Sequence, residues 1–124
     1  MPDYSGHMTH DEYIAIRREE LLGIARDVLN NRILGVEACV RMAPMLGELN
    51  LRQDEDLLII VGVDSECDYI FENKKLSPKI HKQHATHLTA CEEGYRKWIR
   101  IACEKLLGHY AAKWEVAESD EELR

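Results

Sequence analysis

The sequence lacks the features that mark membrane-spanning, secreted and disulfide-stabilised proteins. Its longest uninterrupted apolar run, Leu57 to Val63, has seven residues, whereas a membrane-spanning helix needs about 20. The first residues are polar and contain no apolar core of a secretory signal. Four cysteines are present and none lies in a Cys-x-x-Cys pair: Cys39, Cys67, Cys91 and Cys103. These absences predict a cytoplasmic protein with no membrane segment and with reduced, mostly buried thiols.

Motifs of common enzyme classes are also missing. The seven glycines are scattered singly, so no glycine-rich loop that cradles phosphates is expected. Neither Cys67 nor Cys91 lies in a nucleophile elbow or beside a glycine-rich oxyanion loop. A glycosidase-type pair of acids stays open, but one Phe, two Trp and five Tyr offer few platforms for a sugar. Catalysis is therefore not favoured.

Basic residues are absent from one long segment, residues 53–73. This segment contains seven acids and no Lys, Arg or His, whereas the rest of the chain has sixteen acids and sixteen bases. The net charge of −7 therefore lies entirely in these residues: Asp54, Glu55, Asp56, Asp64, Glu66, Asp68 and Glu72. Binding to phosphates needs a dominant basic face, so a nucleic-acid partner is disfavoured. A concentrated negative patch instead favours a protein partner with a basic surface.

The length of 124 residues predicts a single domain with one core. We place this domain at residues 9–116 and expect flexible segments at 1–8 and 117–124. The letters SGHM within the first eight residues are typical of a cloning remnant, so those residues are left out of the fold prediction. The acidic end of the chain, EVAESDEELR, is expected to fray.

Helical periodicity dominates the first half of the chain. Thr9 or Asp11 can cap a helix that runs to about Asn30, with apolar residues on one stripe. A second helix is predicted from Ile33 or Gly35 to about residue 46. Pro44 falls inside it and should end or kink it. The run at 54–63 is compatible with a buried strand, but no other segment offers that strand a partner. We predict a short buried helix capped by Asp54 or Asp56 and ending near Gly62, with a strand at 57–63 as the alternative.

The second half predicts one long amphipathic helix. Ser77-Pro78 is a typical helix start, and a bend is expected at Gly94 or Gly108. The inward stripe recurs about every four residues: Ile80, His84, Leu88, Cys91, Tyr95, Trp98, Ala102, Leu106, Tyr110 and Trp114. The predicted fold is therefore all-α, with three or four shorter helices packed against one long C-terminal helix.

The acids at 64–72 have several interpretations. An EF-hand is excluded because, counted from Asp64, position 6 is Tyr69 and position 12 is Lys75. A di-iron bundle is excluded because no Glu-x-x-His motif occurs. A solvated loop and a docking face for a partner both stay open. In the second case the predicted partner-binding residues are Asp64, Glu66, Asp68, Tyr69, Phe71 and Glu72, with the two aromatic rings as apolar anchors.

A second candidate site is the histidine-rich turn HKQHATHLTAC. On a helix, His84 and Cys91 share one face and His87 lies between them, a spacing that can hold zinc. We therefore take His84, His87 and Cys91 as a candidate metal set, with His81 and His87 toward the edge of the inward stripe. The sequence does not place a fourth ligand, and the acids at 64–68 are one open source. The competing interpretation is a set of partly buried histidines, so no cofactor is predicted and zinc is the alternative.

The segment VGVDSECDYI resembles a short motif, aIDSETDxLP, of a group of small, uncharacterised bacterial helical proteins. The matching positions are Val63, Asp64, Ser65, Glu66 and Asp68. As in that group, a helical pair precedes the motif, and a long helix with a Tyr-Arg step (Tyr95-Arg96) and a late cysteine (Cys103) follows it, so the resemblance covers roughly residues 10–108. Cys67 replaces the threonine, and Tyr69-Ile70 replaces Leu-Pro. The resemblance implies no activity. By analogy, small acidic helical proteins of this type are often immunity or antitoxin-like partners.

The leading hypothesis is therefore a small acidic protein-binding module. In its concrete form, a bacterial immunity-like protein neutralises a basic toxin domain through the acidic segment. The first alternative is a metal-binding protein that uses the turn from His81 to Cys91. The second is a homodimeric helical scaffold in which the long helix pairs through Trp98 and Leu106.

Overall fold

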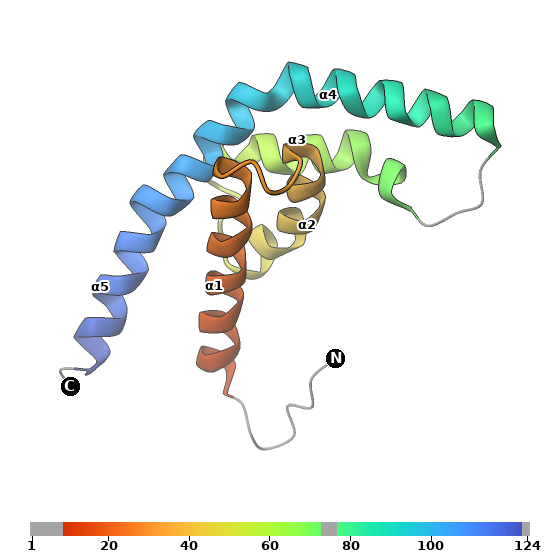
Figure 1. The fold of residues 1–124 in the computed structure, drawn as a ribbon. Helices are drawn as coiled ribbons and strands as arrows, with labels where there is room; N and C mark the ends of the chain where they lie inside the picture. The colour runs from red at the N-terminus through yellow and green to blue at the C-terminus, as the bar shows by residue number, and fades with distance from the viewer. Residues whose placement is uncertain (1–8, 73–76, 123–124) are drawn as a thin grey trace.

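The computed structural model describes residues 9–72 and 77–122, and every regular element in these residues is helical (Figure 1). In chain order the elements are α1 (His10–Leu29), α2 (Gly35–Glu48), the 3₁₀ turn η1 (Glu55–Leu57), α3 (Leu58–Cys67), the 3₁₀ turn η2 (Asp68–Phe71), α4 (Pro78–Lys105), the π-helical turn η3 (Leu106–Tyr110) and α5 (Ala111–Glu122). The predicted all-α fold with one long C-terminal helix is confirmed, and the alternative strand at 57–63 is wrong.

The flexible segment expected at 1–8 lies outside the described residues, as do residues 123–124, whereas the backbone of 117–122 continues α5. None of the helices in the described ranges combines the length and the apolar character needed to cross a bilayer.

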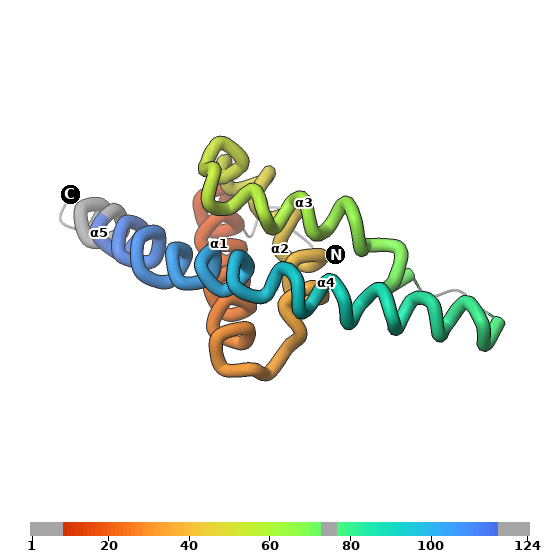
Figure 2. Tube along the Cα trace, turned by 90° about the horizontal axis from the view of Figure 1, so that it is seen from above, coloured from red at the N-terminus to blue at the C-terminus, as the bar shows by residue number. Residues whose placement is uncertain are grey.

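The continuous helix formed by α4, η3 and α5 spans the molecule, and the shorter helices lie on one side of it (Figure 1). In Figure 2, α3 runs beside α4, and α1 crosses the long helix near the end of α4. Helix α2 contacts α1, α3 and α4, and thus lies at the centre of the domain. The core forms where these four helices meet, with Leu21, Met42, Ile60, Ile99 and Leu106 fully buried.

Helix α1 begins as predicted at Thr9, whose hydroxyl accepts a hydrogen bond from the Glu12 backbone N–H at 3.1 Å. It ends at Asn30 and the left-handed Asn31, where φ is 58°. The Arg100 guanidinium of α4 donates to the last carbonyls of α1, at 3.4 Å from Val28 O and 3.3 Å from Leu29 O. Val28 O also accepts from the Asn31 backbone N–H at 3.1 Å. Arg100 adds a donor to both terminal carbonyls and so fixes the end of α1 against α4.

Pro44 is predicted to end or kink the second helix; because α2 continues through Pro44 to Glu48, the first of these alternatives is wrong. Pro44 is exposed, whereas the neighbouring Ala43 and Met45 are buried. Helix α2 packs against other helices. The free energy gained from this burial exceeds the cost of the one backbone hydrogen bond that proline cannot donate.

The acidic turn before α3 starts the helix that the sequence predicts. Asp54 is the N-cap of η1, and its side chain accepts from the Asp56 backbone N–H at 3.0 Å. Helix α3 then runs through Gly62 to Cys67, so the predicted end near Gly62 is wrong. Ile60, Val63 and Cys67 recur at helical spacing and face the core. This burial holds the helix together across the glycine.

Helix α4 begins at the predicted cap, where the Ser77 hydroxyl accepts from the Ile80 backbone N–H at 3.3 Å. The helical path is interrupted only by the π-helical turn η3, which contains Gly108, one of the two predicted bend positions. Residues 78–90 contain no fully buried side chain. This part of α4 extends past α2 and is flanked by α3 and η2 (Figure 1).

Candidate functional site

In the acidic segment, Asp54 and Asp56 are paired with a lysine of the long helix. Lys105 of α4 places its Nζ 2.9 Å from an Asp54 oxygen and 2.8 Å from an Asp56 oxygen. The Tyr110 hydroxyl donates to Asp54 Oδ2 at 2.6 Å, and Lys105 Nζ lies 2.9 Å from both Asp54 oxygens. Burial alone would raise the pKa of Asp54, but the hydrogen bonds from Lys105 and Tyr110 hold it below its ordinary value. The negative charge at this end of the segment is therefore partly balanced within the molecule.

The predicted partner-binding acids lie together at the end of α3 and in η2. Glu66 and Asp68 are exposed, and Glu72 is exposed just after η2. Asp64 is half-buried, and burial, followed by the charge of Asp68, raises its pKa. Glu66 Oε2 accepts a hydrogen bond from the Tyr95 hydroxyl at 2.5 Å.

The two predicted aromatic anchors contact other parts of the protein. Phe71 is half-buried and packs against the core. The Tyr69 ring lies edge-on to His84 at a centroid distance of 4.8 Å and is stacked on His87 at 5.6 Å. The Tyr69 hydroxyl is also hydrogen-bonded to His87 Nδ1. Tyr69 therefore positions the histidines of α4 as well as exposing part of its ring.

A trough of about 610 Å³ lies between α3 and α4. Its apolar lining consists of Leu58, Ile59, Gly62, Gly94, Tyr95, Trp98 and Ile101. The exposed fractions of Trp98, Leu58 and Ile101 are 54%, 45% and 39%. A side chain built on Gly62 or Gly94 would meet nothing within 4 Å, so the two glycines leave open space between the helices.

The position of Trp98 corrects the predicted inward stripe. The stripe places Trp98 in the core, but the buried residues of α4 include Ile99, Ala102 and Cys103. Each residue turns the helix by about 100°. A buried face that includes Ile99 and Ala102 therefore leaves Trp98 toward the trough.

In the described part of the chain, a carboxylate without a lysine partner lies near each end of the trough, Glu55 at one end and Glu66 at the other. Asp56, by contrast, is paired with Lys105. Glu55 and Asp56 lie where η1 leads into α3. Glu66 lies two helical turns after Leu58, near the other end of α3, and is bonded to Tyr95 of the trough. On the α4 side, Lys97 places its amine 5.3 Å from the centre of the Trp98 ring. The surface is thus apolar in the middle, with carboxylates toward each end.

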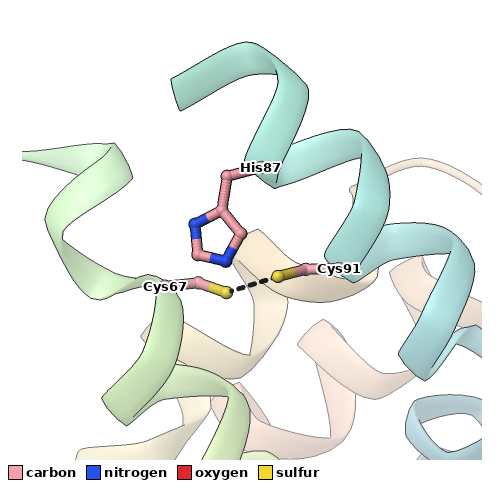
Figure 3. A group of neighbouring side chains, drawn as sticks. All are labelled: Cys67, His87 and Cys91. Carbon is pink, nitrogen blue, oxygen red and sulfur yellow. Dashed lines mark hydrogen bonds between the residues drawn. The ribbon is translucent and has the colours of Figure 1, made fainter. Parts of the chain in front are cut away.

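A second cluster joins Cys67 at the end of α3 to His87 and Cys91 of α4 (Figure 3). The ligand atoms of the three residues all lie within 4.8 Å of one another, and the two Sγ atoms are 3.1 Å apart. Both cysteines are buried and free, and His87 is half-buried. Burial, followed by the hydrogen bond with Cys91, raises the pKa of the Cys67 thiol to about 12. Two sulfurs and an imidazole are donors that suit a soft transition metal.

This cluster differs from the metal set that the sequence predicts. His87 and Cys91 are brought together, but the third residue is Cys67 rather than His84, whose ring packs against Tyr69. His81 is exposed. One sequence signal pointed to Cys67, because it follows Ile60 and Val63 at helical spacing and so shares their buried face.

No protein-family model, no curated protein and no solved structure matches this chain.

Proposed function

We propose that this protein is a protein-binding module whose α3–α4 trough takes an amphipathic helix from a basic partner. The observation that carries the proposal is the pattern of the trough, which is apolar in the middle and has carboxylates toward both ends. A complementary partner helix has apolar side chains in its middle and basic side chains toward its ends. Charge complementarity of this kind speeds association and discriminates between partners.

The exposed apolar side chains support a helical partner. Trp98 and Leu58 extend from opposite walls, and the open space at Gly62 and Gly94 lies between those walls. A helix laid between α3 and α4 can place large side chains at i, i+3, i+4 and i+7 into this space. Tryptophan is also among the residues that most often dominate binding free energy at protein interfaces.

The charge argues against a second copy of the chain as the occupant. A twofold pairing through the trough would bring copies of Glu55, Asp56 and Glu66 near one another in a protein of net charge −7. The predicted homodimer contact through Leu106 is also excluded, because Leu106 is fully buried in the core. A basic toxin domain neutralised by an immunity-like protein is a concrete partner of the required chemistry.

The proposal is tested with designed helical peptides of defined charge. One peptide carries leucines at i, i+3, i+4 and i+7 between lysine-rich ends, and its matched control carries glutamates at those ends. We expect the lysine peptide to bind and the glutamate peptide to bind at least about tenfold more weakly, a difference of about 1.4 kcal/mol. Isothermal titration calorimetry gives the affinity, and the change in Trp98 fluorescence shows where the peptide binds.

Variants of the protein place the contact. Trp98→Ala should abolish binding, and Glu55→Lys with Glu66→Lys should reverse the preference between the two peptides. Glu19→Lys is the matched charge control, because Glu19 is exposed on α1 and makes only a 3.9 Å ion pair with Arg26. Equal binding of both peptides, or binding that survives Trp98→Ala, would rule out the trough as the docking site. Circular dichroism checks that each variant folds.

A further inference from the structure

The geometry points to a zinc site formed by Cys67, His87 and Cys91, and we propose that the protein binds one zinc ion there. The site joins the end of α3 to the middle of α4, next to the trough. None of its three ligands lines the trough.

The separation of the two sulfurs fits two ligands of one metal ion. Tetrahedral zinc with Zn–S bonds of about 2.3 Å holds its two sulfurs about 3.8 Å apart. Cys67 Sγ and Cys91 Sγ are 3.1 Å apart, so a change of about 0.7 Å shared by two side chains produces the zinc geometry. A disulfide needs a much shorter separation, about 2.05 Å. The sulfurs are thus poised between the two arrangements, and a dication supplies the positive charge that two neighbouring thiolates require.

His87 is oriented as a zinc-bound histidine must be. Its Nδ1 is hydrogen-bonded to the Tyr69 hydroxyl, and the ring nitrogen farther from the backbone points toward the two sulfurs (Figure 3). When Nδ1 carries the proton and donates it to Tyr69, Nε2 presents its lone pair to the metal. At known metal sites, a hydrogen bond made by the ring nitrogen that does not bind the metal fixes the tautomer in this way. Tyr69 is therefore a positioning residue for the site.

Glu66 lies beside the cluster but is not one of the three residues whose ligand atoms lie within 4.8 Å of one another. Its Oε1 is 3.7 Å from His87 Nε2, while its Oε2 accepts from the Tyr95 hydroxyl. The hydrogen bond from Tyr95 thus holds the Glu66 carboxylate next to His87. Two thiolates and one imidazole supply three protein ligands, and water would take the fourth position of tetrahedral zinc, as it does in zinc sites with two cysteines and one histidine. Calcium and magnesium are excluded as the preferred ions because they require oxygen ligands.

The position of the site indicates its structural effect. Residues 78–90 of α4 contain no fully buried side chain and extend past α2 beside α3 and η2. Zinc bound by Cys67 and by two residues at 87–91 would join this extension to α3. Because a bound metal stabilises only the folded arrangement of its ligands, zinc should slow hydrogen exchange in 78–90 more than in α1.

The test titrates the reduced, chelator-treated full chain with cobalt(II) and then displaces cobalt with zinc. We expect one cobalt per chain, a tetrahedral visible spectrum and a sulfur-to-cobalt charge-transfer band. Cys67→Ala and His87→Ala should weaken zinc binding by more than the roughly 100-fold upper limit for the loss of an outer-shell partner. Tyr69→Phe should weaken it by about tenfold, as expected for a residue that orients a ligand.

Matched controls separate the site from other cysteines and histidines. Cys103→Ala changes another buried cysteine, His81→Gln changes an exposed histidine of α4, and both should bind zinc as the wild type does. Trp98→Ala should also bind zinc normally, so failure of the partner proposal is distinguishable from failure of this one. His87→Ala changes a side chain that is not fully buried, which keeps the test decisive if Cys67→Ala does not fold.

Two results would overturn the proposal. The first is a reduced wild-type protein that takes up no cobalt with the sulfur-to-cobalt band. The second is a metal that is lost in His84→Gln and retained in Cys67→Ala, since that pattern assigns the ion to the histidine turn of α4 alone.

Discussion

At the scale of single residues, Glu92 shows how one side chain determines where a distant helix begins. The N-cap of α2 is Leu34, which has no side-chain oxygen and makes no side-chain cap. The Glu92 carboxylate of α4, only 8% exposed, accepts from the Val36 backbone N–H at 2.5 Å. A carboxylate is favoured at this position because the free N–H groups and the dipole of the helix both attract negative charge. The start of α2 therefore depends on α4.

We predict that Glu92→Ala lowers the free energy of unfolding by about 1–3 kcal/mol, because it leaves a buried backbone N–H without its acceptor. Glu92→Gln should lose less, since the amide oxygen still accepts a hydrogen bond but carries no charge. Glu93→Ala is the control at the exposed neighbouring position, with an expected change within about 0.5 kcal/mol. Urea unfolding followed by circular dichroism measures all three. Equal stability of Glu92→Ala and Glu93→Ala would contradict this role.

At the scale of helices, glycine has opposite roles in α2 and α3. A Cβ on Gly35 would lie 3.2 Å and 3.3 Å from two carbons of Ile99, which is fully buried. Helix α2 can thus approach α4 closely only because residue 35 has no side chain. Gly62 in the middle of α3 meets no such contact. Its absence of a side chain keeps the trough open at the expense of helix stability.

The two glycines therefore predict opposite effects of the same substitution. Gly62→Ala should raise the free energy of unfolding by about 0.5–1 kcal/mol, because alanine is a better helix former and nothing obstructs its methyl group. Gly35→Ala should lower it by about 1–3 kcal/mol, since the buried Ile99 must move to admit the methyl group. Thermal and urea unfolding of the two variants and the wild type give the comparison. A stabilised Gly35→Ala would show that Ile99 repacks freely.

At the scale of the whole molecule, the long C-terminal helix makes polar contacts with α1, with α2 and with the turn before α3. Arg100 holds the end of α1, Glu92 holds the start of α2, and Lys105 with Tyr110 holds the turn before α3. These polar contacts surround the apolar core and pair carboxylates with donors from distant positions in the chain. The stability of the fold should therefore depend on pH through these carboxylates.

The contact of Asp54 with Lys105 and Tyr110 gives the sign of that dependence. The pKa of Asp54 is lower in the folded than in the unfolded protein. Ionisation of Asp54 therefore stabilises the fold fully at pH values above 3.8, the ordinary pKa of the group. This contribution is lost as the pH falls through the lower folded value. We predict that Lys105→Met reduces the loss of stability between about pH 5 and pH 2, as measured by urea unfolding.

The exposed Glu55→Gln is the matched control for this measurement, because the carboxylate of Glu55 makes no bond to Lys105 in the described residues. It should keep the wild-type slope. An unchanged slope in Lys105→Met would show that the contact does not influence the titration of Asp54.

The candidate site was only partly predictable from the sequence. The spacing of His87 and Cys91 along one helix identified two of the three clustered residues, since four residues make about one turn. Cys67 joins them from another helix, and its partner depends on how α3 is rotated and aligned against α4. The charge count located the acids, but the counterion of Asp54 and Asp56 is Lys105, about 50 residues away in the sequence and brought near only by folding.

Nearby residues were enough to predict the helical class, the cap at Ser77 and the long amphipathic helix, and they reduced the other two caps to Thr9 or Asp11 and to Asp54 or Asp56. These depend on local propensity, on caps within three residues and on a periodicity near 3.6. Tertiary structure decided the exposure of Trp98, the continuation of α2 past Pro44, the cap from Glu92 and the meeting of Cys67 with His87 and Cys91. Each depends on the rotation and register of one helix against another, which close packing of the whole core fixes.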